Sequence, residues 1–422
     1  MTAALVLVLI ALWFGTSHTI ELPDGQERFR ALDALVVEGR LTDSRYSIIG
    51  PLFAVPLYLV GLFWKSPEFW CARYNFLLLV LLVAALHRIF RARLAPQALN
   101  GFLLALAAAS MFPNHQTNFF GDMFTAVFVA IGIAAVSTGR AGLGWTLLVL
   151  GGANTPASVV GVAAVAAVEA VSRRRWRFLL APFAVLALVA VEAWLRRGSP
   201  FTTGYEGYHG FQTLLPTSGR PGFSYPVLLG LLGVLFSFGK GLVWFAPGLL
   251  VPVASDGDPA VRTFQRLSLL FVAGLVPVYA KWWAWYGGWA WGPRFFLFAS
   301  VPASLALASA TAHPAVRAWR RAGLLVALVL STWVGANGAV YGLRGLEFAA
   351  ADGWRWEFLV WHVPEFTVLW HPLVVPVPVS ALEIAVIAVV AVSGALLAAP
   401  VATAFVKDAA ALPGTVRERF RR

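Results

Sequence analysis

The chain has 422 residues, of which 59% are hydrophobic and only 12% are charged, and its formal net charge is +12. Apolar runs near or above the length that crosses a bilayer recur from end to end, which excludes a soluble globular protein. These runs are continuous rather than alternating, so the sequence predicts an all-α polytopic membrane protein rather than a β-barrel. The single cysteine, Cys71, excludes a disulfide framework and a cysteine-based metal site.

Twelve membrane spans are predicted within one domain that covers residues 1–422. The first apolar segment resembles a signal-peptide core, but it lacks a basic segment before it and an A-x-A site after it, so we expect a retained helix. Two other apolar stretches, 48–63 and 226–238, are interrupted by prolines or end at a glycine-flanked lysine, and are expected to be interfacial or re-entrant. The predicted spans cover residues 4–20, 72–90, 98–112, 122–138, 142–152, 157–172, 178–195, 241–255, 267–281, 295–311, 323–341 and 381–400.

Charge orients these spans with the N-terminus inside. The short inner loops then collect arginine clusters, whereas the outer segments carry acids and bases in near balance, as the positive-inside rule predicts. The excess of arginine in the inner loops therefore explains the net charge without a nucleic-acid partner. The composition, rich in alanine, valine and arginine, suggests a GC-rich bacterium, so we expect a multi-pass protein of a bacterial plasma membrane. Function is expected on the outer face, in the long loops 21–71, 113–121, 196–240, 282–294 and 342–380.

The first outer loop carries a dense group of charges. Residues 21–45 hold six acidic and four basic side chains, which are costly beside hydrocarbon and are usually kept for function. Asp24 opens an amphipathic helix that is expected to lie along the membrane plane and to end at Gly39. Asp24 is interpreted either as an N-cap, with Glu27 completing a capping box, or as a general base at a pocket mouth. The two roles are compatible.

The loop after the third predicted span contains the polar run N-H-Q-T-N-F-F-G-D, which ends at Asp122. His115 and Asp122 are possible metal ligands, but two ligands without a third do not predict a metal site. Asn118 shares a helix face with Asp122 if the following helix begins early. A capped turn is the simpler interpretation of the run.

Lys240 lies between Gly239 and Gly241 at the end of the apolar stretch 226–238. The P-loop pattern G-x-x-x-x-G-K-[ST] is not met. The two glycines free the backbone, so that amide groups and one ammonium can hold a phosphate. The alternative is a lysine that extends its ammonium from a helix end toward the interface.

Residues 281–294, KWWAWYGGWAWGPR, form the least ordinary segment of the chain by composition. An interfacial aromatic belt is one interpretation. The glycines and the proline break the helix, however, and aromatic faces suit a sugar ring or an isoprenoid chain. Arg294, at the start of the next span, is placed to bind a phosphate with two hydrogen bonds.

Several segments of the chain, in this order, resemble one family of membrane enzymes. The run from Asp24 to Gly39, with L-x-x-x-G-x-L at 35–41, is similar to the first loop of GT-C glycosyltransferases, in particular the bacterial PMT-like branch that uses polyprenyl-phosphate sugars. Residues 46–61 resemble the second interfacial helix of that branch. The family often has Asp-Glu where this chain has Asp24-Gly25, so its second carboxylate is missing or replaced by Glu27. Further similar patterns are G-x-P-x-x-x-G-Y at 198–205, S-x-x-K-G-L at 237–242 and W-x-G-G-x-x-x-G-P-R at 285–294.

The resemblance implies a GT-C-like fold and an inverting glycosyltransferase. An acceptor hydroxyl would attack the anomeric carbon, a carboxylate would take its proton, and lipid phosphate would leave. The implied catalytic group is Asp24, supported by Glu27 and Asp122. Cationic side chains are then expected to bind the donor phosphate, namely Arg28, Lys240 and Arg294. Side chains expected to contact sugar or lipid are Tyr205, Trp285, Tyr286, Trp289, Trp291, His115 and Asn118.

The expected partners are a polyprenyl-phosphate sugar donor, a glycan, glycolipid or protein acceptor, and the lipid bilayer. No cofactor is expected, and a divalent metal is possible but not supported by the sequence. The alternative function is a flippase or transporter of a lipid-linked sugar. A transporter favours internal repeats and charges deep in the spans, whereas the polar residues of this chain concentrate in the outer loops.

Overall fold

The computed structural model describes residues 2–20, 23–252, 257–312 and 318–410 of the chain. Within these ranges every regular element is helical, which confirms the all-α prediction. Seven of the described helical segments are long and apolar enough to cross a membrane, so the membrane character of the chain is also supported, while the count of twelve spans stays a prediction. These segments are Pro67–Phe90, Pro156–Arg173, Trp176–Arg197, Pro259–Lys281, Arg294–Ala312, Trp319–Val340 and Ala381–Lys407.

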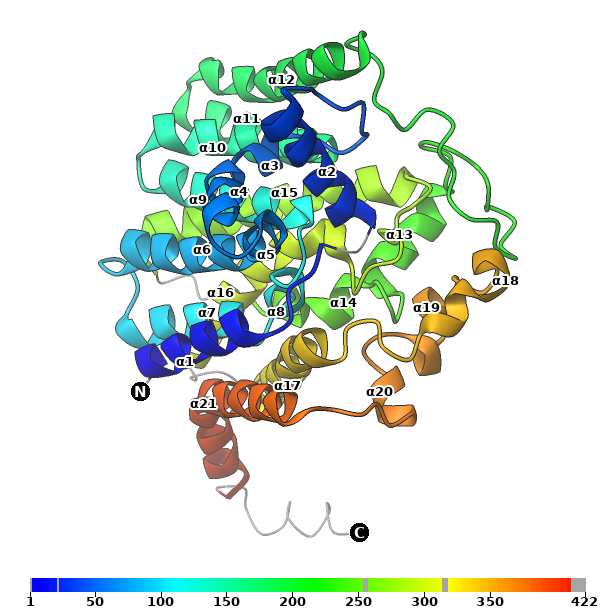
Figure 1. Ribbon diagram of the computed structural model, residues 1–422. Helices are drawn as coiled ribbons and strands as arrows, with labels where there is room; N and C mark the ends of the chain where they lie inside the picture. The colour runs from blue at the N-terminus through cyan, green and yellow to red at the C-terminus, as the bar shows by residue number, and fades with distance from the viewer. Residues whose placement is uncertain (1, 21–22, 253–256, 313–317, 411–422) are drawn as a thin grey trace.

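Eleven of the twelve segments predicted as spans coincide with helices. Figure 1 shows four of them, α12, α11, α10 and α9, one above another on one side of the bundle. The helices are α1 (Thr2–Gly15), α6 (Tyr74–Phe90), α7 (Pro96–Ala108), α9 (Gly121–Ser137), α10 (Ala141–Asn154), α11 (Val159–Arg173), α12 (Leu180–Arg197), α15 (Pro259–Lys281), α16 (Ser300–Ala312), α17 (Ala318–Val340) and α21 (Ala381–Ala410).

The predicted span 241–255 is wrong. Only two short elements form there, α14 (Leu242–Phe245) and η3 (Pro247–Leu250), and positions 253–255 lie outside the described residues. Pro247 has no amide hydrogen to continue a helix. Gly248 lies so close to the backbone carbonyl of Ala303 in α16 that a side chain there would collide with it. The stretch is apolar because it packs inside the bundle, not because it forms one long helix.

Both stretches predicted to be interfacial or re-entrant form broken helices. Residues 48–63 give α3 (Ile49–Leu52) and α4 (Val55–Phe63), separated at Phe53-Ala54, and residues 226–238 give α13 (Val227–Phe236). The polypeptide between α13 and α14 leaves helical geometry over Ser237–Gly241. Lys240 therefore lies in the break between α13 and α14, where backbone groups are free to bind other segments.

Nearly all residues of helix α9 are buried. It contacts α10 closely through glycines, since a Cβ atom on Gly132 would lie 2.9 Å from the carbonyl oxygen of Gly144. Small residues of this kind let two helix backbones approach, which is a common basis of packing in membranes. The tight contact holds α9 against α10, and Asp122 lies in the first turn of α9.

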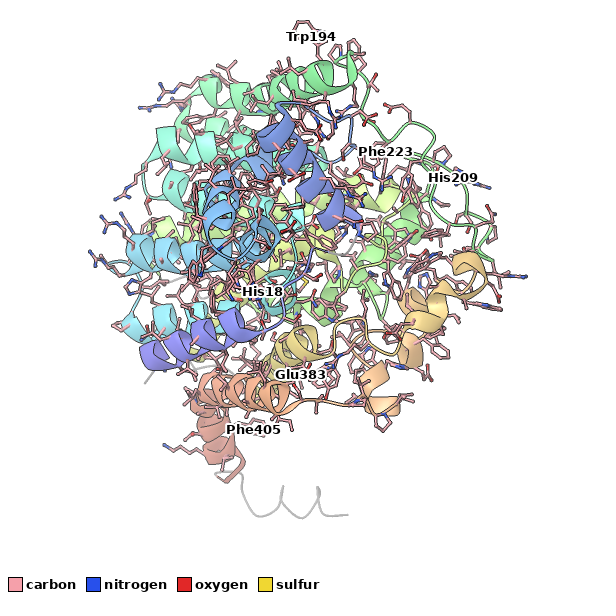
Figure 2. The ribbon with its side chains drawn as sticks, viewed as in Figure 1. His18, Trp194, His209, Phe223, Glu383 and Phe405 are labelled. Atoms are coloured by element: carbon pink, nitrogen blue, oxygen red, sulfur yellow. The ribbon has the colours of Figure 1, made fainter. Side chains whose placement is uncertain are left out.

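The segments predicted to lie on the outer side include α2 (Pro23–Glu38), the loop from α12 to α13, and the short elements α18 (Ala351–Trp354) and α19 (Leu359–His362). In Figure 1 that loop runs along one edge of the molecule from α12 to the vicinity of α18 before it returns to α13. Figure 2 labels His209 and Phe223 on the same loop, and both side chains are exposed. Segments far apart in the sequence therefore meet on one side of the bundle.

Candidate functional site

A buried carboxylate, Asp24, lies between two guanidinium groups. The Nε atom of Arg28, one turn later in α2, lies 2.6 Å from Oδ1 of Asp24. The Nη1 atom of Arg294, 270 positions along the chain, lies 2.8 Å from Oδ2. Asp24 is 6% exposed and Arg28 is 7% exposed. Charges so buried are stable only when each has a partner, and both oxygens of Asp24 have one.

Asp122 extends this group from the first turn of α9. Its Oδ2 atom lies 3.7 Å from Nη1 of Arg294, so this guanidinium stands between two carboxylates. Gly121 packs directly against Arg28, because a Cβ atom there would lie 2.5 Å from the guanidinium carbon. We call Asp24, Arg28, Asp122 and Arg294 the charged cluster. Four of the side chains selected from the sequence are thus brought together.

Helix α12 holds the first outer loop in place around the cluster. Nη1 of Arg28 donates to the carbonyl oxygen of Ser47 at 3.0 Å, and the Ser47 hydroxyl donates to Glu192 at 2.7 Å. Arg196 donates to the carbonyl oxygen of Tyr46 and to Glu192, each at 2.6 Å. Neither Glu192 nor Arg196 was singled out from the sequence, where both are merely polar residues at the end of an apolar run.

Asn154, at the end of α10, also contacts this region. Its Oδ1 atom accepts a hydrogen bond from the Gly50 amide at 3.0 Å, and its Nδ2 atom donates to the Gly121 carbonyl oxygen at 2.9 Å. One buried amide therefore fixes α3 against the start of α9. A lone asparagine in an apolar helix is the only sequence signal for this role.

Asp24 is ionised in this environment. Burial raises the pKa of its carboxyl, but the guanidinium groups of Arg28 and Arg294 together lower it by more. The net pKa therefore lies below the ordinary value. The pKa of Arg28 is raised, because the Asp24 carboxylate outweighs the effect of burial. The cluster thus combines two carboxylates with two guanidinium groups in a desolvated setting.

The N-cap interpretation of Asp24 does not hold, since Asp24 lies within the first turn of α2 and its carboxylate binds arginine. Glu27 does not join the cluster. It accepts a hydrogen bond from the Ser44 hydroxyl at 3.1 Å and lies 3.8 Å from Arg45. The predicted end of the helix is confirmed, because α2 stops at Glu38 and Gly39 adopts a φ of +65°.

A hollow borders the charged cluster, between the first turn of α9, the end of α10, α15 and η4 (Arg294–Ala299). Asp122 and Arg294 form part of its wall, and Oδ2 of Asp122 and Nε of Arg294 have no hydrogen-bond partner among the described residues. The polar wall also contains Thr125, Thr155, Ser158 and Tyr279, and the apolar wall contains Ala126, Phe271, Leu275, Phe295, Leu297 and Phe298. The hollow therefore has polar groups on one side and apolar rings on the other.

Lys240 lies apart from the charged cluster, and its side chain points into the aromatic segment 281–294. It is 4% exposed, and its Nζ atom donates to the carbonyl oxygens of Ala290 at 2.6 Å and Gly292 at 3.2 Å, with that of Gly288 at 3.4 Å. Burial lowers the pKa of the ammonium to about 7, although the nearby Glu357 carboxylate raises it. Backbone carbonyl oxygens therefore surround this ammonium.

The aromatic residues of 281–294 are mostly packed inside the fold. Trp285, Tyr286 and Trp291 are buried, whereas Trp289 is half-buried and contacts Trp354. Tyr286 stacks on Trp361 with ring centroids 3.6 Å apart, and Trp291 donates from Nε1 to Asn337 at 2.9 Å. Packing between outer segments therefore accounts for their positions. Contact with sugar or lipid stays a prediction for them.

Two polar residues predicted to contact the substrate are also internal. Asn118 accepts a hydrogen bond from the Phe120 amide at 3.0 Å, which confirms the capped turn. Burial lowers the pKa of His115 to about 3, so its ring is neutral, and neither ring nitrogen has a partner among the described residues. The described residues include no group of three side chains that could hold a metal ion.

Tyr205, on the loop from α12 to α13, lies beside the charged cluster. Burial raises the pKa of its hydroxyl, and the charges of Tyr46 and Asp24 raise it further. The Arg45 guanidinium lies 5.8 Å from the Tyr205 ring centroid and 4.1 Å from that of Tyr208. Both rings therefore face Arg45, and Tyr205 also interacts electrostatically with Asp24, Arg28 and Arg294.

Comparisons with protein-family models, with curated proteins and with solved structures found no match to this chain. The resemblance of its motifs to GT-C enzymes therefore rests on the residues themselves. The charged cluster is the strongest structural support for assigning a function.

Proposed function

We propose that the protein is an inverting GT-C-type glycosyltransferase that takes its sugar from a polyprenyl-phosphate donor at the outer face of the plasma membrane. The observation that carries this proposal is the charged cluster beside a hollow with a polar and an apolar wall. A polyprenyl-phosphate sugar has matching parts, since an anionic phosphate joins a polyhydroxyl ring to a hydrocarbon chain. The acceptor is a hydroxyl of a glycan, glycolipid or protein.

Arg28 and Arg294 would bind the donor phosphate. The acceptor oxygen forms a bond to the anomeric carbon while the bond from that carbon to the phosphate oxygen breaks. The bonding electrons leave with the lipid phosphate, whose added negative charge the guanidinium groups stabilise. The proton of the acceptor hydroxyl passes to Asp24, which is ionised and can therefore act as the base.

A carboxylate bound by two guanidinium groups is a weak base, so the donor itself has to prepare the site. An incoming phosphate competes with Asp24 for Arg28 and Arg294, because phosphate oxygens match the same planar fork. Each hydrogen bond that Asp24 loses raises the proton affinity of its carboxylate. Asp122 remains beside Arg294 and keeps this cation in place. Glu27, which faces Ser44 and Arg45, has no role in this scheme.

The proposal is tested with purified protein in nanodiscs, incubated with labelled polyprenyl-phosphate sugars and a panel of envelope acceptors. We expect transfer of label from at least one donor, with inversion at the anomeric carbon. In a parallel assay the protein is placed in liposomes that contain labelled lipid-linked sugar. Movement of this lipid between leaflets, without transfer to any acceptor, would reject the enzyme and support a transporter.

A further inference from the structure

Three outer segments that are distant in the sequence meet at Lys240. The lysine itself belongs to the break between α13 and α14, and its ammonium binds carbonyl oxygens of the turn 288–292. The third segment is the last outer loop, because the Gly239 amide donates to the Trp361 carbonyl oxygen at 3.0 Å. A side chain at position 239 would collide with the backbone of Val360. The break between α13 and α14 therefore contacts the last outer loop through its backbone, and the turn 288–292 through the Lys240 ammonium.

A second buried titratable side chain, Glu357, accompanies this lysine, and burial raises the pKa of its carboxyl to about 7 although the Lys240 ammonium lowers it. It is 1% exposed, its carboxylate interacts electrostatically with the Lys240 ammonium, and the Tyr286 hydroxyl bonds to it. Its Oε2 atom has no hydrogen-bond partner among the described residues. A single charge in such a place is strongly destabilising, whereas two opposite charges offset each other. We therefore expect Lys240 and Glu357 to depend on one another.

The turn that Lys240 holds leads directly to Arg294. Gly292 has a φ of +60° and Gly287 has a φ of +81°, both in the region that favours glycine. A Cβ atom on Gly287 would lie 3.0 Å from Cγ of Arg294, so the start of the turn packs on the arginine stem. The start of the turn thus packs on Arg294, and its end, Gly292, lies two positions before Arg294 in the chain, so a shift of the turn moves the guanidinium that binds Asp24.

We infer that Lys240 is a positioning residue, which fixes Arg294 through the turn 288–292 and has Glu357 as its buried counter-charge. This differs from a direct contact between the ammonium and the donor phosphate. The link to Arg294 rests on the proposed function, since it assumes that Arg294 binds the phosphate. The dependence of Lys240 on Glu357 does not rest on it.

Binding of a polyprenyl phosphate distinguishes a positioning role of Lys240 from direct contact between its ammonium and the phosphate. The probe is a fluorescent polyprenyl phosphate, titrated into nanodiscs that carry each variant. Lys240→Met leaves Glu357 unpaired and releases the turn, so we expect affinity for the probe and transfer to fall about a hundredfold, as misplacement of a binding group does. The double variant Lys240→Met/Glu357→Gln removes both charges, and we expect it to recover most of the loss. Lys407→Met, on the exposed end of α21, is the matched control and stays unchanged.

Arginine substitution gives a second distinction. A lysine that binds phosphate directly can be replaced by arginine, which binds phosphate at least as well. The carbonyls around Lys240 leave no room for a planar guanidinium, so we expect Lys240→Arg to lose affinity for the probe like Lys240→Met. Full affinity in Lys240→Arg, or no recovery in the double variant, would overturn the positioning role.

The pair itself is tested by thermal unfolding of four proteins, the wild type, Lys240→Met, Glu357→Gln and the double variant. We expect the fall in Tm of the double variant to be smaller than the sum of the two single falls. Additive falls would show that Lys240 and Glu357 do not interact. This measurement needs no substrate, so it decides on the pair even if no donor supports transfer.

Discussion

Asp24 shows how the setting of one side chain defines its chemistry. The sequence places it at the start of an amphipathic helix, which is compatible with a capping role, and the structure surrounds it with two guanidinium groups. An ionised carboxylate in that position accounts for the buried Arg28 and Arg294 and contributes to stability. As the base of the proposed reaction, it needs the donor phosphate to draw those cations away.

The lowered pKa of Asp24 predicts how stability depends on pH. The folded protein holds this carboxyl at a lower pKa than the unfolded chain, so its contribution is complete above the unfolded value of about 3.9. The contribution is lost as the pH falls through the folded value. We therefore expect the wild type to lose Tm on acidification below about pH 4, and Asp24→Asn to lose less over the same interval.

This is measured by intrinsic tryptophan fluorescence during thermal unfolding in detergent at several pH values. Glu38→Gln, which changes an exposed carboxylate on the same helix, serves as the control. Parallel pH profiles of the wild type and Asp24→Asn would contradict an ionised, arginine-bound Asp24.

Gly121 offers a separate test of Arg28. In Gly121→Ala the new methyl group occupies the space of the guanidinium, which has to move aside and loses part of its pairing with Asp24 and Ser47. We expect Tm to fall, because a buried ion pair is disturbed, and transfer to fall about tenfold or more through loss of a charge-assisted hydrogen bond. Gly142→Ala, in the open part of α10, is the control that keeps full transfer. An unchanged rate in Gly121→Ala would remove Arg28 from the site.

At the scale of elements, helices were easier to predict than the breaks between them. Eleven predicted spans coincide with helices, because long apolar runs leave few alternatives in a membrane. The span 241–255 failed where Pro247 and Gly248 follow an apolar run, since close packing on α16 replaces helix formation there. Apolar composition alone does not distinguish a crossing helix from a buried irregular segment.

The attachment of the first outer loop to α12 is the element contact on which the site depends. Arg196 is buried and binds Glu192, the Tyr46 carbonyl oxygen and the Thr42 carbonyl oxygen. Arg196→Leu leaves the partly buried Glu192 without its cationic partner, so we expect a loss of about 3 kcal/mol in unfolding free energy. Arg40→Ala, which removes an exposed pair with Glu38, should cost no more than about 1 kcal/mol.

Thermal unfolding and limited proteolysis measure this attachment, since the loop 40–48 should become cleavable in Arg196→Leu. Equal stability of the two variants, with the loop still protected, would show that α12 does not hold it.

For the whole molecule, the sequence predicted the residues of the site better than their grouping. Asp24, Arg28, Asp122 and Arg294 were all selected, but only folding shows that they meet, since two of them lie 270 positions apart. Lys240 was assigned to the same phosphate, whereas the structure directs its ammonium into the aromatic turn. Glu357 was missed, because a single acid in a loop rich in aromatic residues carries no pattern. Long-range contacts of this kind are not encoded in local periodicity.

The central claim is that Asp24 takes the proton of the acceptor during transfer from a polyprenyl-phosphate sugar. The most direct test is the initial rate of sugar transfer by wild type, Asp24→Asn and Glu38→Gln, reconstituted side by side. We expect Asp24→Asn to lose about 10²–10⁴ in rate while it still binds polyprenyl phosphate, and Glu38→Gln to match the wild type. Transfer by Asp24→Asn at the wild-type rate would contradict the assignment of this residue as the base.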